Sequence, residues 1–371
     1  MAIKTEEMVL NMGPQHPSTH GVLRLELEIE GELVKNVKPH IGYLHRCFEK
    51  HCEAMTYPQI VPYTDRMDYL ASMYNNFGYA VAVERLLGIQ VPERVEYIRI
   101  IVSELQRIAS HMVALGTYGV DIGAFTPFLF LFAEREKVLT IFEETCGARL
   151  LYNYVWVGGL SHDIHPDFVR KTKEFVNGFK PRITELNNLL SYNKIFTERT
   201  ANIGILPADV AINYGVTGPN LRASGVKWDL RKNDTYSIYN KFDFEIPVGE
   251  GLKGTIGDCW DRYYVRVLEM EQSIRIIEQA IDNIPDGNVQ EAIPKRIKPP
   301  KGTIYSRVEN PKGELGYFII SDGNVNPFRV KVRAPSFVNM EVFGELCKGH
   351  FVADVIAILG SIDVVLGEID R

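Results

Sequence analysis

Residues 260–284 read WDRYYVRVLEMEQSIRIIEQAIDNI, a run whose periodicity sets the expected architecture. Its apolar positions recur at alternating steps of three and four: Trp260, Tyr263, Val267, Met270, Ile274, Ile277, Ile281 and Ile284. This heptad spacing predicts one long helix whose apolar seam packs against partner helices along its whole length. A protein organised around such a helix needs further helices to bury that seam.

Helical patterns continue upstream of this run. From Arg66 onward the pattern is helical, and apolar residues between Val95 and Leu115 recur at steps of three and four, with Pro92 near the start. Thr126 and Pro127 predict the N-cap and first turn of another helix, which ends near Gly147. The segment 65–284 is therefore expected to form a central helical bundle.

Strand patterns occupy both ends of the chain. After a loop ending near His20, residues 23–30 alternate aliphatic with charged side chains, and Gly31-Glu32 indicates a hairpin turn, so 1–64 is read as a loop and β-hairpin region. The segment 285–371 begins with a Pro-rich connector, continues with three short strands and finishes in a closing helix at 352–359. The expected fold is α+β and predominantly α, with the three segments forming one integrated domain.

Composition excludes several classes of protein. The 371 residues are 46% hydrophobic and carry a net charge of -6, which indicates a folded chain without the basic excess of a nucleic-acid binder. The start of the chain, MAIKTEEMVL, lacks the apolar run of a secretory signal, so an intracellular chain is expected. Residues 112–133 are apolar, but Asp121 and Pro127 argue against a membrane span. The five cysteines form no C-x-x-C pair, so no disulfide framework or thiolate metal cage is encoded.

Histidines supply the first candidate site. His16 and His20 flank a Pro-Ser-Thr turn, where they either point into one cavity and deliver protons or bond to nearby backbone. Cys47 and His51 could bind zinc from one helical face, or belong to an amphipathic turn. Four ligands are not assembled there, so no metal is expected.

Acidic residues supply the second candidate site. The run 65–69, Asp-Arg-Met-Asp-Tyr, looks like a helix start; it is either a capping and salt-bridge cluster or a phenol donor in a ligand pocket. Asp121 interrupts an apolar stretch, so it either caps a helix or needs a functional partner. Gly249 to Gly254 fits no phosphate-binding loop, and residues 221–225 lack the first glycine of a G-x-S-x-G elbow. Nucleotide binding by this chain and hydrolase chemistry are therefore not expected.

Taken together, these segments resemble the D subunit of NADH-quinone oxidoreductase, respiratory complex I, in the family's order over nearly the whole chain. The motifs are GPQHPSTHGVLR at 13–24, IGYLHR at 41–46, DRMDY at 65–69, TPF at 126–128, LRASGV at 221–226, GELG at 313–316, SDG at 321–323, RAPSF at 333–337 and the final Asp370-Arg371. The resemblance implies a fold like the large subunit of nickel-iron hydrogenases. The metal-binding cysteines of that fold are replaced at Asp68, Ala71, Val365 and Glu368, so soft thiolate ligation is lost.

The same resemblance implies a site. The family's quinone headgroup ligands fall on His20 and Tyr69, and Asp121 falls on the acidic partner of that histidine. His16 helps to form the quinone-binding loop, and Arg46 lies near the iron-sulfur cluster of the neighbouring subunit. An imidazolium and a phenol can supply the two protons that a two-electron quinone reduction needs.

The implied function is that of a peripheral-arm subunit of a proton-translocating NADH:quinone oxidoreductase, which forms the quinone site together with the B subunit. The B subunit carries a tetranuclear iron-sulfur cluster, NADH binds elsewhere in the complex, and this chain binds no redox cofactor and has no activity in isolation. The expected partners are the B, C, I, A and H subunits of complex I. The expected location is peripheral, on the cytoplasmic side of the bacterial inner membrane, attached through the membrane-arm subunits.

Other readings stay open at this point. A related complex fed by ferredoxin would use the same subunit, the chain could be a scaffold, or it could be a stand-alone metalloenzyme using His16, His20 and His51. Two departures from the family matter most. Leu151 stands where family members often have a histidine close to the cluster. Its absence predicts weaker coupling of cluster reduction to protonation, which suits a low-potential quinone such as menaquinone. The sequence does not decide between menaquinone and ubiquinone. Cys47 replaces the usual glycine after His-Arg.

Overall fold

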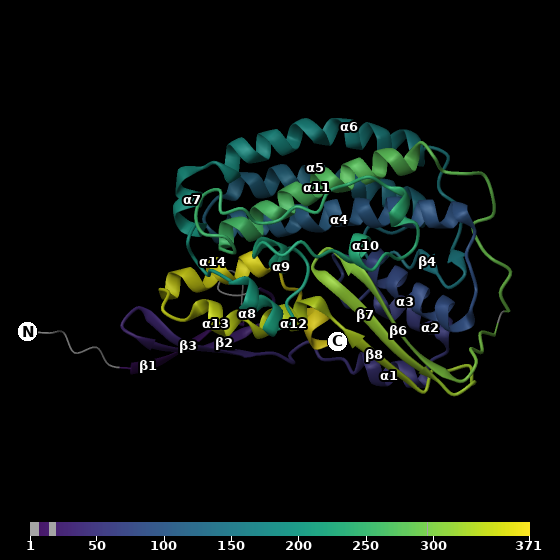
Figure 1. The fold of residues 1–371 in the computed structure, drawn as a ribbon, viewed down its shortest axis with the longest axis horizontal. Helices are drawn as coiled ribbons and strands as arrows, with labels where there is room; N and C mark the ends of the chain where they lie inside the picture. The colour runs from purple at the N-terminus through teal and green to yellow at the C-terminus, as the bar shows by residue number, and fades with distance from the viewer. Residues whose placement is uncertain (1–6, 15–19, 295) are drawn as a thin grey trace, which may run out of the picture.

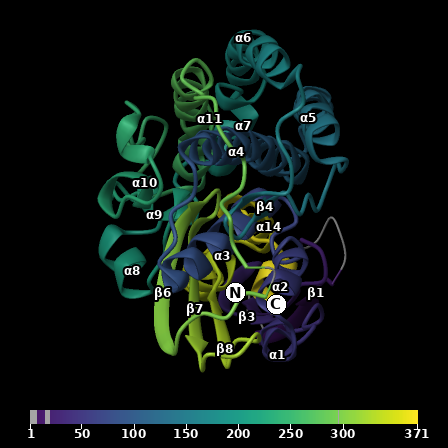
Figure 2. The same ribbon diagram turned by 90° about the vertical axis from the view of Figure 1, so that its right-hand side faces the viewer.

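A computed structural model of the chain describes residues 7–14, 20–294 and 296–371. Long helices lie side by side in one layer, and a C-terminal sheet lies beneath them (Figure 1). The view turned by 90° places α4 (Glu93–Asp121) between the outer helices and that sheet (Figure 2). The fold is therefore α+β and predominantly helical, as the sequence predicted.

Four helices form the bundle: α4, α5 (Phe125–Cys146), α6 (Phe168–Leu186) and α11 (Cys259–Ile281). Helix α11 begins where the side chain of Asp258 accepts a hydrogen bond from the amide of Asp261 at 2.8 Å. It packs on α4 and α6, and its heptad seam is buried as predicted, although the helix ends before Ile284. Among the described residues, none of the helices combines the length and the apolar character needed to cross a membrane.

The start of α5 differs from the prediction. Its N-cap is Ala124, so Thr126 lies inside the helix and does not cap it. The reason is the tight turn after α4, where the amide of Ala124 donates to the carbonyl of Gly119 at 2.7 Å and lets the next helix begin at Phe125. The predicted end is confirmed: Gly147 has a φ of 76°, and its amide donates to Glu143.

The N-terminal sheet contains the predicted hairpin, β2 (Arg24–Glu30) and β3 (Leu33–His40), with the aliphatic side chains of β2 facing the core. The loop expected before His20 is partly wrong, because β1 (Glu7–Met12) adds an antiparallel edge strand to β2. Its side chains are mostly exposed, so β1 is held by backbone pairing and shows no alternating apolar pattern.

The C-terminal sheet has the order β6 (Gly302–Asn310), β7 (Gly313–Ser321) and β8 (Arg329–Arg333), all antiparallel, which confirms the three predicted strands. Helix α3 (Ser72–Leu87) packs on β6 and β7. The expected closing helix is α14 (Val352–Ile362), but it is not the last element. Helix α15 (Leu366–Asp370) follows it, and at five residues it is too short to show a helical period in the sequence.

Shorter elements connect these parts: α1 (Phe48–Ala54), α2 (Tyr57–Thr64), β4 (Val155–Trp156), β5 (Gly159–Leu160), a π-helix (Asn187–Ser191), α7 (Lys194–Thr200), α8 (Ala208–Asn213), α9 (Pro219–Ala223), α10 (Leu230–Asn233), a 3-10 turn (Tyr239–Lys241), α12 (Pro335–Glu341) and α13 (Phe343–Cys347). The run 65–69 is not a helix start, which corrects the prediction. It lies in a turn between α2 and α3. There the carboxylate of Asp68 accepts a hydrogen bond from the amide of Leu70 at 3.1 Å, and the backbone carbonyl of Asp68 accepts one from the amide of Ala71.

Candidate functional site

The end of α4 carries an imidazole-carboxylate pair. Nε2 of His20 lies 2.9 Å from Oδ2 of Asp121, the last residue of α4, and the two side chains are only 20% and 8% exposed. Asp121 does not cap the following helix, whose N-cap is Ala124. Its charge within an apolar stretch is thus explained by its partner, the pairing that the family resemblance implied.

Helix α14 approaches this pair closely because it presents Gly360. A Cβ there would lie 2.9 Å from Oδ2 of Asp121 and 2.6 Å from the ring of Tyr118, so any side chain would displace the carboxylate. The ring of Tyr118 is fully buried against Phe196 and Tyr263. Packing of α14 against α4 therefore fixes the carboxylate that holds His20.

Tyr69 lies close to the same region. Its ring packs over Gly367, where a Cβ would lie 3.6 Å from Cε1 of Tyr69 and 2.8 Å from the carbonyl of Met67. Next to it on α15, the side chain of Leu366 lies beside Gly21, the neighbour of His20: a Cβ on Gly21 would be 3.8 Å from Cγ of Leu366. Two consecutive residues of α15 thus join the segment of His20 to that of Tyr69. Tyr69 is 40% exposed, and the partial burial of its phenol, followed by the charge of Asp68, raises the pKa of Tyr69, so it keeps its proton at neutral pH.

Arg46 is exposed and lies against the C-terminus. Its guanidinium donates to the carbonyl of Arg66, in the turn that carries Tyr69, and its amide donates to the carbonyl of Arg371 at 3.3 Å. The carboxylate of Asp370 accepts from the amides of Gly42 and Leu44, both at 2.7 Å. The IGYLHR segment and the C-terminus are therefore held together beside Tyr69.

Two further predictions from the sequence remain, His16 and the pair Cys47 and His51. His16 lies outside the described residues, so its role stays a prediction. Cys47 is the exposed N-cap of α1, and its carbonyl accepts from the amide of His51 at 2.9 Å. Within residues 7–14, 20–294 and 296–371, no three or more His, Cys, Asp or Glu side chains are arranged to hold a metal ion. The zinc hypothesis thus gains no ligand set there.

Behind Tyr69 lies a group of ionisable side chains that the sequence did not single out as a site. We call Asp68, Lys312, Asp363 and Glu368 the Lys312 cluster. Nζ of Lys312 is 3.2 Å from Oδ2 of Asp68 and 3.7 Å from Oδ2 of Asp363, and all four side chains are buried. Lys312 follows a proline in what reads as an ordinary exposed hairpin turn, so its burial left no signal in the sequence.

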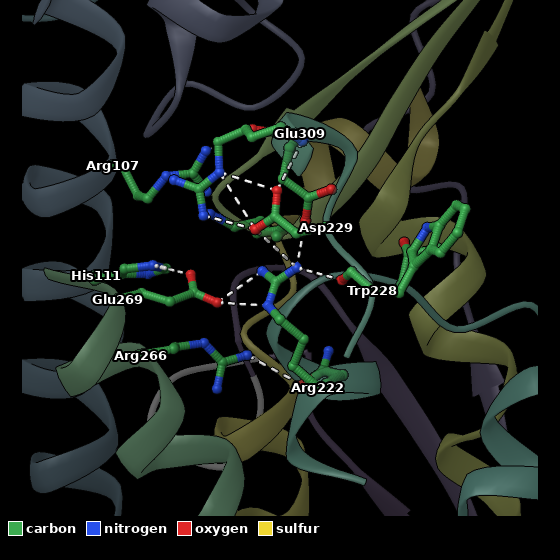
Figure 3. A network of polar contacts seen from close by, with 12 residues as sticks. Arg107, His111, Arg222, Trp228, Asp229, Arg266, Glu269 and Glu309 are labelled. Atoms are coloured by element: carbon green, nitrogen blue, oxygen red, sulfur yellow. Dashed lines mark hydrogen bonds and ion pairs between the residues drawn. The ribbon is translucent and has the colours of Figure 1, made fainter. Parts of the chain in front are cut away.

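A larger buried network continues from this cluster through Arg266, whose Nε is 3.8 Å from Oδ2 of Asp363. Figure 3 shows this network around Arg222 and Glu269. Arg222 contacts Glu269 at 2.6 Å and Glu309 at 2.8 Å, and His111 contacts Glu269 at 2.9 Å. The other members are Glu104, Arg107, Asp229 and Arg231. Burial alone would raise the pKa of Glu104, but Arg107 and Arg231 outweigh it and lower that pKa to about 2.

The sequence did carry a faint signal for this network. Glu104, Arg107 and His111 on α4 follow steps of three and four, as do Arg262, Arg266 and Glu269 on α11. Such stripes are usually read as solvated faces. Here both are buried because α4 and α11 pack against each other and against further elements.

The family model described as respiratory-chain NADH dehydrogenase, 49 Kd subunit, matches residues 121–299 and 290–371. The chain belongs to this family. Curated relatives named as the D subunit of NADH-quinone oxidoreductase agree over all of this chain: it is 58% identical to the one from Chlorobium luteolum, covering 94% of that protein. It is 57% identical to that of Chlorobaculum tepidum and 56% identical to that of Prosthecochloris aestuarii, covering 93% of each.

Membership of the complex I family confirms the reading drawn from the sequence motifs. The chain is a subunit of an oxidoreductase complex, and other subunits of complex I are its partners. In that setting, the described geometry offers an imidazole held by a carboxylate and a protonated phenol on neighbouring segments. Such a pair can donate protons to an acceptor that is being reduced.

Proposed function

We propose that His20, Tyr69 and Asp121 form, together with the B subunit, the site where complex I reduces quinone. The observation that supports this most is the contact of His20 with Asp121. Helix α15 links this contact to Tyr69, because Leu366 lies beside Gly21 and Gly367 lies beneath the ring of Tyr69. A scaffold would have no need for an acid, an imidazole and a phenol in one place. His16, four residues before His20, helps to form the quinone pocket.

The chemistry follows from the two donors. A quinone that accepts two electrons needs two protons to become a quinol, one on each oxygen. His20 donates to one oxygen from Nδ1, since Nε2 faces Asp121, and Tyr69 donates its phenolic proton to the other. Asp121 holds the imidazole in position and balances its charge. The electrons come from the iron-sulfur cluster of the B subunit, since this chain binds no redox cofactor, and NADH binds elsewhere in the complex.

The same proposal places the chain in the assembly. Arg46 is exposed on the segment beside Tyr69, where its fixed positive charge would face the cluster of the B subunit and favour the reduced form. The partners are the B, C, I, A and H subunits. The chain is peripheral, on the cytoplasmic side of the bacterial inner membrane, and the complex couples quinone reduction to proton translocation.

The proposal is tested with Tyr69→Phe in the assembled complex in native membranes. We expect inhibitor-sensitive quinone reduction driven by NADH to fall by about a hundredfold, because a positioned proton donor contributes at least that much. The iron-sulfur cluster should still be reduced by NADH, as seen by electron paramagnetic resonance. Tyr192→Phe is the control, because Tyr192 is exposed on a different segment.

Normal turnover of Tyr69→Phe would overturn the role of Tyr69. The electron donor is tested in the same membranes by offering reduced ferredoxin in place of NADH. Turnover with ferredoxin alone would favour the related complex and would leave the quinone site unchanged. An isolated, colourless chain that is active on its own would overturn the proposal as a whole.

A further inference from the structure

The Lys312 cluster contains more acids than the cations around it can neutralise. Lys312 contacts the carboxylates of Asp68 and Asp363, and Arg266 is the other described cation that contacts Asp363. The carboxyl of Glu368 is fully buried beside them. Two cations face three acids, and an unbalanced buried charge is costly, so the cluster is neutral only if it holds one proton.

Glu368 is the acid whose contacts suit a proton. Oε2 of Glu368 accepts a hydrogen bond from the amide of Ser336 at 3.0 Å, while Oε1 is buried and accepts none from the described residues. Within the same part of the chain, Oδ2 of Asp68 and Oδ2 of Asp363 also accept no hydrogen bond, but both face the ammonium of Lys312. An ionised carboxylate oxygen without a partner costs far more to bury than a neutral O–H does, so protonation lowers the cost at this position.

The cluster is adjacent to Tyr69 on two sides. Asp68 precedes Tyr69 in the same turn, and Glu368 follows Gly367, the residue beneath the ring of Tyr69. The charges of Asp68 and Lys312 act on Tyr69, and the same two charges act on Glu368. Asp68 and Lys312 thus lie within electrostatic range of both Tyr69 and Glu368.

We propose that the Lys312 cluster holds one proton, on Glu368, and returns it to Tyr69 after Tyr69 has protonated the quinone. This inference rests on the proposed function. The phenolic O–H of Tyr69 breaks as the quinone O–H forms, which leaves a phenolate. The carboxyl O–H of Glu368 then breaks as the phenol re-forms. Because Glu368 is buried and Tyr69 is partly exposed, the carboxylate regains a proton from solvent by way of the Tyr69 phenol. The electrons come from the iron-sulfur centre of the neighbouring subunit, so the balance needs no further reactant.

The titration of Glu368 agrees with this role. Burial, and then the charge of Asp68, raise the pKa of Glu368 to about 8, so the group holds its proton at neutral pH. The groups that face it are Asp68 from the turn, Lys312 from the β6–β7 hairpin, Ser336 from α12 and the buried Tyr317 from β7. Ser336 and Lys312 oppose the rise but do not cancel it.

Glu368→Gln in the assembled complex tests the proposal. Glutamine keeps an oxygen for the amide of Ser336 but cannot release a proton. We expect kcat for quinone reduction to fall about tenfold at pH 6 to 7 with little change in KM, because only proton return is slowed. Above pH 9 Glu368 of the wild type has lost its proton, so kcat of the wild type and kcat of the variant should become equal. The alkaline decline of the wild type near pH 8 should be absent from the variant.

Asp261→Asn is the matched control. Burial raises the pKa of Asp261 to about 6, and its carboxylate accepts backbone amides of Gly251 and Gly257, but it lies at the start of α11, outside the cluster. This variant should keep the wild-type profile. Infrared difference spectra give a second readout: quinone reduction should alter a protonated-carboxyl band in the wild type and in Asp261→Asn, and that band should be missing from Glu368→Gln.

A ratio of wild-type to Glu368→Gln activity that stays constant with pH, or an infrared band that persists in the variant, would overturn the inference. These outcomes are separate from failure of the proposed function. If Tyr69→Phe is inactive while Glu368→Gln keeps the wild-type profile, only the proton store is refuted. If Tyr69→Phe turns over normally, the quinone role itself is refuted.

Discussion

Nε2 of His20 lies 2.9 Å from Oδ2 of Asp121, although 101 positions separate the two residues in the chain. The contact joins the segment before β2 to the end of the longest bundle helix, so the bundle sets the position of an imidazole that the N-terminal segment supplies. A carboxylate in this position orients the ring and selects which nitrogen faces the acceptor. The catalytic value of His20 should therefore depend on Asp121.

Replacing Asp121 with asparagine should lower kcat for quinone reduction by about ten- to a hundredfold and leave KM nearly unchanged. Asparagine preserves the shape of the side chain but removes the charge that balances the imidazolium, so the loss falls on proton transfer and not on binding. Steady-state kinetics in membranes measure this change, and electron paramagnetic resonance checks that NADH still reduces the cluster.

Asp282→Asn serves as the control for Asp121→Asn, because Asp282 is an exposed residue just after α11 that pairs with Lys173 at the surface. Its kinetics should match those of the wild type. If Asp121→Asn also turned over at the wild-type rate, the carboxylate would have no part in proton transfer, and the contact with His20 would only stabilise the fold.

The buried network predicts a large effect on stability. Arg222 is fully buried and contacts Glu269, Glu309 and Asp229, so Arg222→Met should leave Glu269 and Glu309 without their closest arginine. Breaking a buried pair by removing one side costs about 3–5 kcal/mol. Pulse proteolysis of this subunit within the purified complex measures the loss of free energy of unfolding.

Arg275→Met provides the comparison, since Arg275 pairs with Asp243 at the surface and both side chains are largely exposed. Such a pair contributes about 1 kcal/mol or less. Equal proteolysis rates for Arg222→Met and Arg275→Met would mean that the buried arginine is not required by the acids around it.

The sequence predicted the elements whose periodicity is long or strict. Helix α11 shows an unbroken heptad seam, and β2 alternates apolar with charged residues over its length, so burial on one face could be read directly. The Pro-rich connector and the three C-terminal strands were found for similar local reasons. These patterns need no knowledge of distant contacts.

The rest depends on tertiary structure. Strand β1 and helix α15 have little local signal, since one is held by its partner strand and the other is short. The contact of His20 with Asp121 was reached only through the family resemblance, because no spacing rule joins residues so far apart. Lys312 looks like any hairpin residue until the fold buries it against Asp68. A local sequence pattern therefore cannot predict which charged side chains the fold will bury.

Stability should also depend on pH through Glu368. Its folded pKa of about 8 lies above its ordinary value of 4.5, so the folded chain binds the proton more tightly than the unfolded chain. The resulting stabilisation is complete below about pH 4.5 and is lost as the pH rises through 8. Glu368→Gln should remove this fall, so the difference in stability between wild type and variant should change in the variant's favour from pH 5 to pH 8.

Pulse proteolysis of the subunit in the complex at pH 5, 6.5 and 8 measures this difference. The difference in stability between wild type and Asp261→Asn should change at lower pH than the difference for Glu368→Gln, because burial raises the pKa of Asp261 only to about 6. A difference between wild type and Glu368→Gln that does not vary between pH 5 and 8 would show that Glu368 stays ionised when buried.

The last prediction concerns Leu151, which has a φ of 59°, a backbone conformation in which leucine is rare and histidine is more readily accepted. With no imidazole at this position, the midpoint potential of the iron-sulfur cluster that we propose in the neighbouring subunit should change by clearly less than about 59 mV per pH unit, the value for one proton per electron. Leu151→His should steepen that slope without disturbing the backbone. Redox titrations of the cluster signal between pH 6 and 8 measure both slopes, and a full proton-coupled slope in the wild type would show that another group near the cluster titrates with it.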